Sequence, residues 1–254
     1  MGAAAVLDDS DLERYSRQLL VPEVDIAGQE ALAAATVLVV GLGGLGCPAA
    51  LYLAAAGVGT LRLADGDRVE LSNLQRQVAH TEAGLGDNKA ESAARAVRAL
   101  NQRVEVEVLA RHLDADSMGA AVRGADLVLD ASDRFATRHA LNRACVAAGV
   151  PLLSAAAIRM EGQLALFDTA RGGPCYRCLY PDAAADDSNA ACAENGVLGP
   201  VVGVLGSLQA LEAIKFLVGM EQSLRGAVLM LDLRSLSMQR LVLERRSGCP
   251  DCRR

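Results

Sequence analysis

The stretch TVLVVGLGGLGCPAALYLAAAGVGTLRLAD, residues 36–65, organises the chain. Its β-branched run 37–40 predicts a buried strand, and a turn of glycines leads from it into a small-residue helix at about 45–56. A second predicted strand, 60–64, ends at the acid Asp65. Strand, glycine turn, helix, strand and acid in this order predict a nucleotide-binding unit of the doubly wound, Rossmann-like α/β class.

Four glycines form this turn, namely Gly41, Gly43, Gly44 and Gly46. Glycine lets a backbone approach a phosphate group closely, and the helix that follows presents its N-terminus to that anion. Asp65 is placed to accept hydrogen bonds from ribose hydroxyls. A membrane-spanning helix is the alternative, because no charge falls between Ala31 and Leu61, but the glycines and the strand-like ends argue against it.

Composition narrows the class of protein further. The chain has 254 residues, of which 52% are hydrophobic and only 3% aromatic, so we expect helices that pack closely on small side chains. A formal net charge of −6 argues against a general nucleic-acid binder. The acidic start MGAAAVLDDSDLE is unlike a signal peptide, so we expect a cytoplasmic protein with no nucleic-acid or membrane partner.

Repeated strand–helix units predict a mostly parallel sheet with right-handed crossovers up to about residue 158. From Met160 the pattern changes, and three strands at 162–168, 227–232 and 238–244 predict antiparallel additions to the sheet. A helix is predicted over 199–218, with Pro200 in its first turn.

We therefore expect a single domain over 1–254. It would consist of an N-terminal helical arm (10–35), a nucleotide-binding half (36–158) and a second half (159–254) that contains a crossover loop (181–198).

The N-terminal arm predicts a short helix that begins at a capping box of Ser10 and Glu13. Arg14 and Arg17 lie nearly on one face of that helix. Spacing alone is also compatible with two solvated surface charges.

Polar residues gather where predicted strands end. Asn73, Arg76 and Gln77 follow the second strand, and an arginine there can bind phosphate oxygens with two parallel hydrogen bonds. An ordinary surface turn explains the cluster equally well. Lys89 begins a helix, where a cation opposes the helix dipole unless an anion binds nearby or the side chain turns into water.

Asp133 follows another buried strand, in the sequence DASD (130–133). A carboxylate at this edge of a sheet can hold Mg²⁺ against a polyphosphate. Asp133 or its neighbour Ser132 can instead cap the helix that comes next. The residues alone leave both interpretations open.

Two C-x-x-C pairs predict a closed zinc site, namely Cys175, Cys178, Cys249 and Cys252. Four thiolates leave no open coordination position for water, so such a zinc is structural; a redox-active dithiol is the alternative. Cys192 lies in a polar loop before a helix and is either an incidental thiol or a nucleophile for thioester or persulfide chemistry. Cys47 and Cys145 are expected to be buried.

The three histidines have no metal-ligand spacing, and we assign them no role. His80 follows the polar cluster that ends at Gln77, whereas His112 and His139 are expected on the surfaces of loops or helices.

Nine pieces occur in the order typical of one family: RYSRQ (14–18), GLGGLGC (41–47), LADGD (63–67), LSNLQRQ (71–77), DNKAESA (87–93), DASD (130–133), CYRCL (175–179), GVLGPVVGVLGSLQALEAIKFL (196–217) and GCPDC (248–252). Together they resemble the ThiF/MoeB/HesA group, bacterial relatives of ubiquitin-activating E1 enzymes. Such enzymes use ATP and Mg²⁺ to adenylylate the C-terminal Gly-Gly carboxylate of a ubiquitin-like sulfur-carrier protein, and pyrophosphate leaves.

By this resemblance the glycine loop and several polar residues would bind ATP, namely Asp65, Asp67, Asn73, Arg76, Gln77, Lys89 and Asp133. Within this set Asp65 would bind ribose and Asp133 would hold Mg²⁺. Arg14 resembles an arginine that reaches into the neighbouring subunit's site, which implies a homodimer. Cys192 resembles a crossover-loop cysteine that some members use in sulfur transfer, and the paired cysteines resemble the family's zinc ligands.

The resemblance implies a mechanism without a general base, because the attacking carboxylate is already ionised. Arg14, Arg76, Lys89 and Mg²⁺ would neutralise the charge that builds on the α-phosphorus and on the leaving pyrophosphate. One position departs from the family pattern, since Arg134 stands where Asn commonly follows the magnesium aspartate. A cation there either adds a phosphate contact or hinders the metal.

Two other functions compete with this interpretation. The glycine motif alone is compatible with an NAD-dependent oxidoreductase, and Arg134 is compatible with a catalytically inactive E1-like scaffold. The pathway also stays open between molybdopterin and thiamin synthesis. AAIRMEGQ (156–163) favours the molybdopterin branch, whereas ALYLAAAGVGTLRLAD (50–65) and RSGCPDC (246–252) favour the thiamin branch. Sulfur is expected from a separate donor, a cysteine desulfurase or a rhodanese-like protein.

Overall fold

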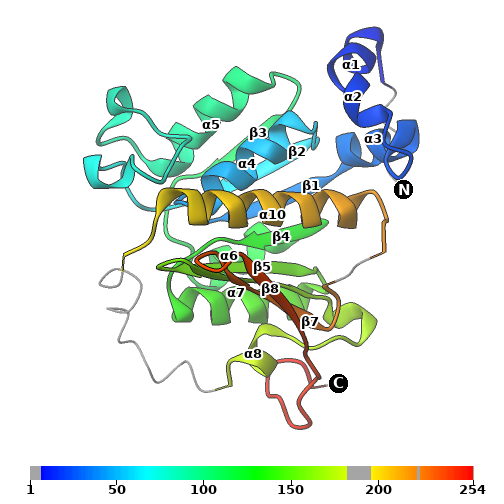
Figure 1. Ribbon diagram of the computed structural model, residues 1–254, viewed down its shortest axis with the longest axis vertical. Helices are drawn as coiled ribbons and strands as arrows, with labels where there is room; N and C mark the ends of the chain where they lie inside the picture. The colour runs from blue at the N-terminus through cyan, green and yellow to red at the C-terminus, as the bar shows by residue number, and fades with distance from the viewer. Residues whose placement is uncertain (1–6, 182–195, 222–223, 254) are drawn as a thin grey trace.

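The computed structural model describes residues 7–181, 196–221 and 224–253. Its centre is an eight-stranded sheet with the order β3-β2-β1-β4-β5-β6-β7-β8 (Figure 1). The strands are β1 (Thr36–Val40), β2 (Thr60–Ala64), β3 (Glu105–Leu109), β4 (Leu127–Asp130), β5 (Leu152–Ile158), β6 (Glu161–Phe167), β7 (Ala227–Asp232) and β8 (Ser237–Val242). Strands β1 to β5 pair in parallel, and β5 to β8 pair antiparallel, as the sequence predicts.

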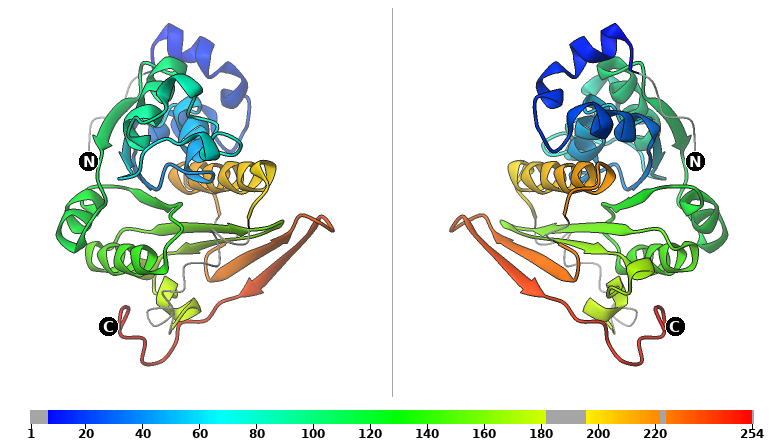
Figure 2. Two further views of the ribbon diagram at one scale, coloured as in Figure 1. Left: turned by 90° about the vertical axis from the view of Figure 1, so that its left-hand side faces the viewer. Right: turned by 90° about the vertical axis from the view of Figure 1, so that its right-hand side faces the viewer.

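Helices cover both faces of this sheet. They are α1 (Asp9–Arg14), α2 (Ser16–Leu19), α3 (Asp25–Ala34), α4 (Gly46–Ala55), α5 (Lys89–Leu100), α6 (Ala115–Val122), α7 (Phe135–Ala148), α8 (Tyr176–Leu179) and α10 (Gly199–Leu217). Figure 2 shows α6 and α7 on one face and α4, α5 and α10 on the other, while the β7–β8 hairpin extends from the edge of the sheet. The 31–61 region is thus a strand, a turn and a helix, which excludes a membrane span there.

The two helical layers enclose two separate hydrophobic cores. Val37 and Val39 of β1 face the core under α4, α5 and α10, whereas Leu38 and Val40 face the core under α6 and α7. This alternation follows from the two-residue repeat of a strand, and burial on both sides explains why β1 is almost entirely apolar.

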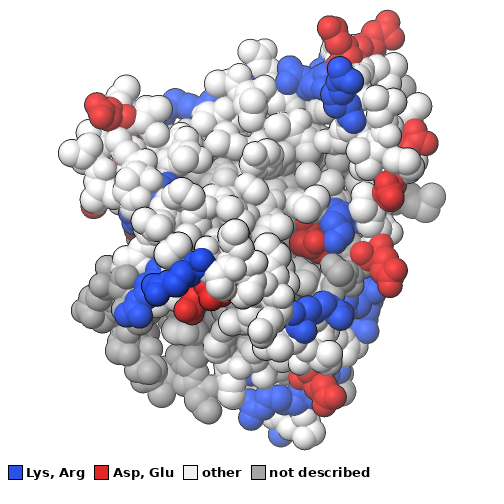
Figure 3. All heavy atoms as spheres, viewed as in Figure 1, with Lys and Arg blue, Asp and Glu red and all other residues white. Residues whose placement is uncertain are grey.

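Helix α10 is the one described helix with the length and apolar composition of a membrane span, with 39% of its most apolar window buried. It packs against α4, β5 and β6 in this fold. Part of its outer side is apolar and exposed, including Val204 and Leu211. Figure 3 shows a broad uncharged area over this helix, with charged side chains around its margin.

Two predicted helix caps are wrong. The capping box of α1 is formed by Asp8 and Asp11, two residues before the predicted pair of Ser10 and Glu13. Asp8 also forms an ion pair with Arg103 (2.7 Å). This contact connects the N-terminal arm to the region before β3 and favours the earlier start of the helix.

The N-cap of α7 is Arg134, without a side-chain capping bond, so neither Ser132 nor Asp133 caps that helix. The hydroxyl of Ser132 donates instead to Asp130 Oδ1 (2.6 Å). The carboxylate of Asp133 is therefore not consumed by a structural cap.

In the strand order β2-β1-β4-β5, the connections from β1 and from β4 lead to opposite edges of the sheet. The topological switch point of the sheet therefore lies between β1 and β4. The helices that follow these two strands, α4 and α7, lie on opposite faces of the sheet, so their connecting turns separate and leave a crevice. The residues that bind a ligand are expected at this edge of the sheet.

Candidate functional site

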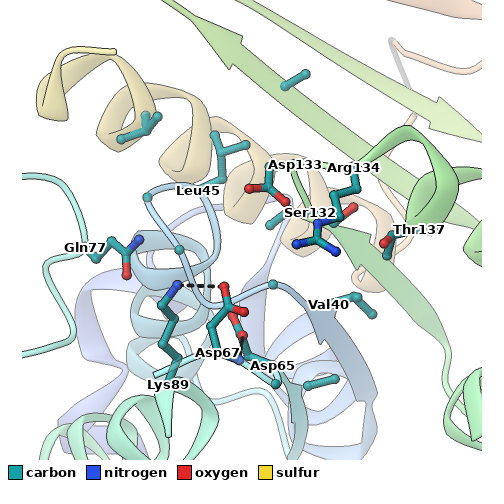
Figure 4. Close-up of a pocket in the computed structure, with 18 of the residues that line it drawn as sticks. Val40, Leu45, Asp65, Asp67, Gln77, Lys89, Ser132, Asp133, Arg134 and Thr137 are labelled. Atoms are coloured by element: carbon teal, nitrogen blue, oxygen red, sulfur yellow. Dashed lines mark hydrogen bonds and ion pairs between the residues drawn. The ribbon is translucent and has the colours of Figure 1, made fainter. Parts of the chain in front are cut away.

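A cavity of about 670 Å³ opens at the carboxyl ends of the parallel strands. Val40, Ala64 and Ala131, at the ends of β1, β2 and β4, form part of its wall. Many of the residues that the sequence predicts as nucleotide ligands also line it: Gly41, Gly43, Gly44, Asp65, Asp67, Arg76, Gln77, Lys89 and Asp133. Figure 4 shows Lys89 and Asp67 together on one side of the cavity, across from Ser132, Asp133 and Arg134.

The glycine loop needs its glycines for close packing. Gly41 has a φ of +92°, which side chains with a Cβ rarely adopt. A Cβ on Gly46 would overlap the carbonyl oxygen of Gly41, and one on Gly44 would lie 2.7 Å from Val202 Cγ2 of α10. Gly46 therefore shapes the loop from behind, while the other glycines form its surface toward the cavity.

Asp65 braces this loop through two backbone contacts. Its Oδ2 accepts a hydrogen bond from the Leu42 amide (2.7 Å), and its Oδ1 accepts one from the Asp67 amide (2.8 Å). Burial raises the pKa of Asp65, although these two amides act in the opposite direction. Its role toward ribose stays a prediction.

Lys89 is buried, so the alternative of a lysine turned into water is wrong. Its side chain is only 10% exposed, and Nζ lies 3.0 Å from Asp67 Oδ2. Asn88 caps the helix by accepting from the Ala90 amide (2.8 Å) and donates to the carbonyl of Asp65 (3.0 Å), which fixes the start of α5 beside the glycine loop. The lysine ammonium is thereby placed at the cavity.

The opposite wall comes from the turn between β4 and α7. The buried carboxylate of Asp130 anchors that turn, because it accepts from Ser132 Oγ (2.6 Å) and from Ser154 Oγ of β5 (2.7 Å). Asp133 and Arg134 then extend into the cavity, and the Asp133 carboxylate makes no hydrogen bond or ion pair within the described part of the chain. An unpaired carboxylate at this cavity fits Mg²⁺, which binds through one or two carboxylates together with substrate phosphates.

Some predicted site residues lie elsewhere. Asn73 is buried behind the cavity and accepts from the Glu70 amide (3.3 Å). Arg14 lies at the other end of α5, where Nη1 donates to the carbonyl of Leu100 (3.3 Å), about 16 Å along that helix from Lys89. Cys192 falls outside the described residues.

The cavity also contains residues to which the sequence analysis gave no role. Arg111, His112 and Leu113 follow β3, and Thr137 and Arg138 come from the first turn of α7. His112 Nε2 lies 3.5 Å from Asp67 Oδ1. The end of β3 was a usable signal, since residues directly after parallel strands share one edge of the sheet.

The four paired cysteines form a second, separate site. Their Sγ atoms all lie within 4.8 Å of one another, and all four residues are buried. Sγ of Cys175 is 3.6 Å from that of Cys249, and Sγ of Cys178 is 3.6 Å from that of Cys252, so each pair contributes to one compact cluster. A soft, closed tetrathiolate donor set fits Zn²⁺.

Asn142 of α7 connects the two cysteine pairs. Its Oδ1 accepts from the Tyr176 amide of the first pair (2.8 Å), and its Nδ2 donates to Asp251 Oδ2 of the second pair (2.9 Å). Arg177 Nη1 lies 3.3 Å from the other oxygen of Asp251. The role of this amide was not predicted, because nothing in the local sequence around residue 142 indicates a partner 109 residues away.

One of the histidines differs from expectation. His139 is 3% exposed, so its predicted surface position is wrong; it packs edge-on against Tyr176. His80 is also buried, and its ring is hydrogen-bonded behind the glycine loop. The predicted burial of Cys47 and Cys145 is confirmed, and burial raises the pKa of the Cys47 thiol to about 12.

The chain matches the ThiF family over residues 15–251. It is 51% identical over 248 residues to the mouse protein named adenylyltransferase and sulfurtransferase MOCS3, a match that covers 98% of this chain and 53% of that protein. It is 46% identical over 248 residues to the molybdopterin-synthase adenylyltransferase of Escherichia coli K12, a match that covers 98% of this chain and 99% of that enzyme. The chain thus spans about half the length of the mouse relative and nearly all of the bacterial one.

Solved structures also resemble it. E. coli MccB crystallised with ATP superposes with a TM-score of 0.82 at 25% identity, over 94% of this chain and 74% of that one. PaaA superposes with a TM-score of 0.82 at 23% identity, over 94% of this chain and 85% of that one, which shows a likeness of fold alone.

Proposed function

Because the chain belongs to the ThiF family, we propose that it adenylylates the C-terminal Gly-Gly carboxylate of a ubiquitin-like sulfur-carrier protein, with ATP as the donor. The observation that carries this proposal is the 46% identity to a molybdopterin-synthase adenylyltransferase that the chain covers almost end to end. The cavity of about 670 Å³, with its glycine loop, buried lysine and unpaired carboxylate, supports it.

The nucleotide would lie along the glycine loop. Asp65 would receive the ribose, while Gly43 and Gly44 would receive the phosphates through their backbone amides. Asp67, Asn73 and Gln77 complete the proposed nucleotide-binding set. Asn73 would act there by shaping the turn that carries Gln77, since it bonds to Glu70 and does not line the cavity.

The reaction joins a carboxylate oxygen of the carrier to the α-phosphorus and breaks the bond to pyrophosphate. Two anions must approach each other, so cations reduce the barrier. Lys89 lies ready at the cavity, and binding of a phosphate would draw its ammonium away from Asp67. Arg76 lines the same cavity, with Nη1 3.0 Å from the carbonyl of Ser72.

Mg²⁺ held by Asp133 would supply further positive charge at the phosphates. The neighbouring Arg134 also lines the cavity, and its guanidinium would add a phosphate contact. Zn²⁺ in the tetrathiolate cluster would have a structural role. The half at 36–158 would hold the nucleotide, and the half at 159–254, with Cys192 in its crossover loop, would receive the carrier.

A homodimer is part of the proposal. Arg14 contacts Leu100 at the far end of α5, about 16 Å along that helix from Lys89, and would therefore serve a site that belongs to a second copy. The uncharged area over α10 offers a surface for that copy (Figure 3). A separate cysteine desulfurase or rhodanese-like protein would supply sulfur to the activated carrier, and the cytoplasm stays the predicted compartment.

The relatives favour the molybdopterin carrier over the thiamin carrier, because the bacterial one is named for molybdopterin synthase. ATP–pyrophosphate exchange, measured with purified protein and each candidate carrier, tests this choice. We expect exchange only with the molybdopterin-type carrier and its loss in Asp133→Ala. Asp116→Ala, an exposed acid on α6, serves as the matched control.

Exchange with the thiamin-type carrier alone would contradict the assigned pathway. No exchange with any carrier, from protein that is folded and contains zinc, would favour the inactive scaffold. In that case Arg134→Asn would be the first variant to test.

A further inference from the structure

His80 lies directly behind the glycine loop and does not line the cavity. It is 6% exposed. Its Nε2 lies 2.9 Å from the carbonyl oxygen of Leu42, its Nδ1 lies 3.0 Å from Ser92 Oγ, and its backbone amide donates to the carbonyl of Gln77 (3.0 Å). The ring of His80 thus connects the glycine loop with helix α5, and its backbone connects both with the polar turn.

The chemistry of these partners determines the tautomer of the ring. A carbonyl oxygen only accepts, so Nε2 of His80 carries the hydrogen that is donated to Leu42. Nδ1 of a neutral ring then accepts from the hydroxyl of Ser92. Burial lowers the pKa of His80, which favours this neutral form.

The bond to Leu42 determines the direction of the next amide. In a trans peptide the C=O and N–H groups point to opposite sides, and the described chain has no cis peptide. The carbonyl of Leu42 points into the interior, toward His80 and toward Cys47 Sγ (3.2 Å). The N–H of Gly43 therefore points the other way, toward the cavity that Gly43 lines.

The Gly43 amide has no acceptor within the described residues. The amide on the other side of Leu42 is already used, because Asp65 Oδ2 accepts it. The Leu42 residue is thus held at both of its backbone polar groups, and the donor next to it is left available for a ligand.

We infer that His80 is a positioning residue, which holds the Leu42–Gly43 peptide so that the Gly43 amide donates to a phosphate oxygen of ATP. This inference rests on the proposed function, and it adds a residue that touches neither nucleotide nor carrier. Ser92 lies one helical turn after Lys89 on α5, so the same imidazole also sets the distance between the amide donor and the lysine ammonium.

A pair of polar substitutions separates positioning from general packing. In His80→Gln the amide nitrogen can replace Nε2 and still donate to Leu42. In His80→Asn the shorter side chain places its amide where Nδ1 was. It can then bond to Ser92 but does not reach the carbonyl of Leu42. Both variants remove the ring, so a purely structural role predicts similar losses for the two.

The measurement is calorimetric binding of MgATP to the full-length, zinc-containing protein in the absence of carrier. We expect His80→Asn to weaken binding about tenfold, the effect of one lost hydrogen bond to a charged group, and His80→Gln to stay within about threefold of wild type. In exchange assays the loss should appear in the KM for ATP, with the KM for the carrier unchanged. Wild-type binding by His80→Asn, or equal losses in both variants, would overturn the inference.

A measurement on the unmodified protein covers the case in which a variant does not fold. With ¹⁵N-glycine labelling and Gly43 identified through Gly43→Ala, MgATP should shift the Gly43 amide proton downfield. No shift on saturation would overturn the inference. Failure of the proposed function looks different, since the wild type would then bind no MgATP or would bind it without exchanging pyrophosphate for any carrier.

Discussion

The nucleotide cavity and the cysteine cluster are built in opposite ways. The cavity has charged groups that are partly exposed and partly paired with one another, such as Lys89 with Asp67, whose side chain is 53% exposed. The cluster has four buried thiols, and it is supported by Asn142, which accepts from the Tyr176 amide and donates to the Asp251 carboxylate. The first arrangement suits a ligand that enters and leaves, and the second suits an ion that stays. Substitutions in the two regions should therefore damage different properties.

The largest effect is expected from a cysteine ligand. Cys175→Ser should abolish stoichiometric zinc and lower the midpoint of thermal unfolding by about 10 °C or more, because a structural metal contributes directly to folding free energy. Metal analysis and scanning calorimetry measure both quantities. Cys145→Ala, which removes a buried thiol outside the cluster, should keep its zinc. A Cys175→Ser protein that melts like wild type would contradict the structural role.

Removal of a cation from the cavity should instead reduce activity strongly and change stability little. Lys89→Met should lower pyrophosphate exchange about a hundredfold, because it removes a charge from the developing transition state. Stability should change by less than about 1 kcal/mol, since methionine has a similar length and the remaining Asp67 is half exposed. Lys215→Met on α10 controls for the loss of a cation away from the cavity. Full exchange by Lys89→Met would remove this lysine from the proposed mechanism.

A variant of Asn142 tests whether the hydrogen bonds around the cluster contribute to zinc affinity as its four ligands do. Asn142→Asp keeps the shape but turns an acceptor toward Asp251 Oδ2, so the second cysteine pair should lose its anchor. We expect zinc affinity to fall about tenfold to a hundredfold, which competition with a chelator measures. MgATP binding by the zinc-loaded variant should stay unchanged. An unaltered zinc affinity would show that the thiols alone hold the site.

The smallest expected effect is the contribution of Asp65 to the pH dependence of the free energy of unfolding. Burial raises the pKa of this carboxyl in the folded protein, so its ionisation costs folding free energy. The contribution of Asp65 to stability is fully present below its unfolded pKa of 3.8 and is lost as pH rises through the folded pKa. Wild type should therefore lose stability relative to Asp65→Asn as pH rises from 4 toward neutrality, as denaturant unfolding at a series of pH values would show. A stability difference that does not vary with pH would contradict this account.

The sequence predicts most of the fold because local patterns and tertiary packing agree. The apolar run of β1 and the glycine turn before α4 each indicate the element that forms. The caps of α1 and α7 were missed for different physical reasons. For α1 a long-range contact favours the earlier start, because Arg103 pairs with Asp8. For α7 a local contact competes with capping, because the hydroxyl of Ser132 donates to Asp130, two residues earlier.

Within the site, the residues at strand ends were predictable and those acting from behind were not. Lys89, Asp65 and Asp133 follow or precede regular elements, so their place at the sheet edge can be inferred from the sequence. His80 and Asn142 act through partners 38 and 109 residues away, and only the packed structure brings these pairs together.

The cysteine cluster also has a consequence for the order of events in biosynthesis. It joins residues 74 positions apart in the sequence, and α10, β7 and β8 lie within the loop that it closes. Cys175 and Cys178 leave the ribosome long before Cys249 and Cys252, so the nascent chain carries two unpaired ligands while its nucleotide-binding half is already complete. Zinc held by all four thiols would fasten the second half only after residue 252 has emerged. A newly made chain that met no metal at that moment would keep its C-terminal residues unfastened.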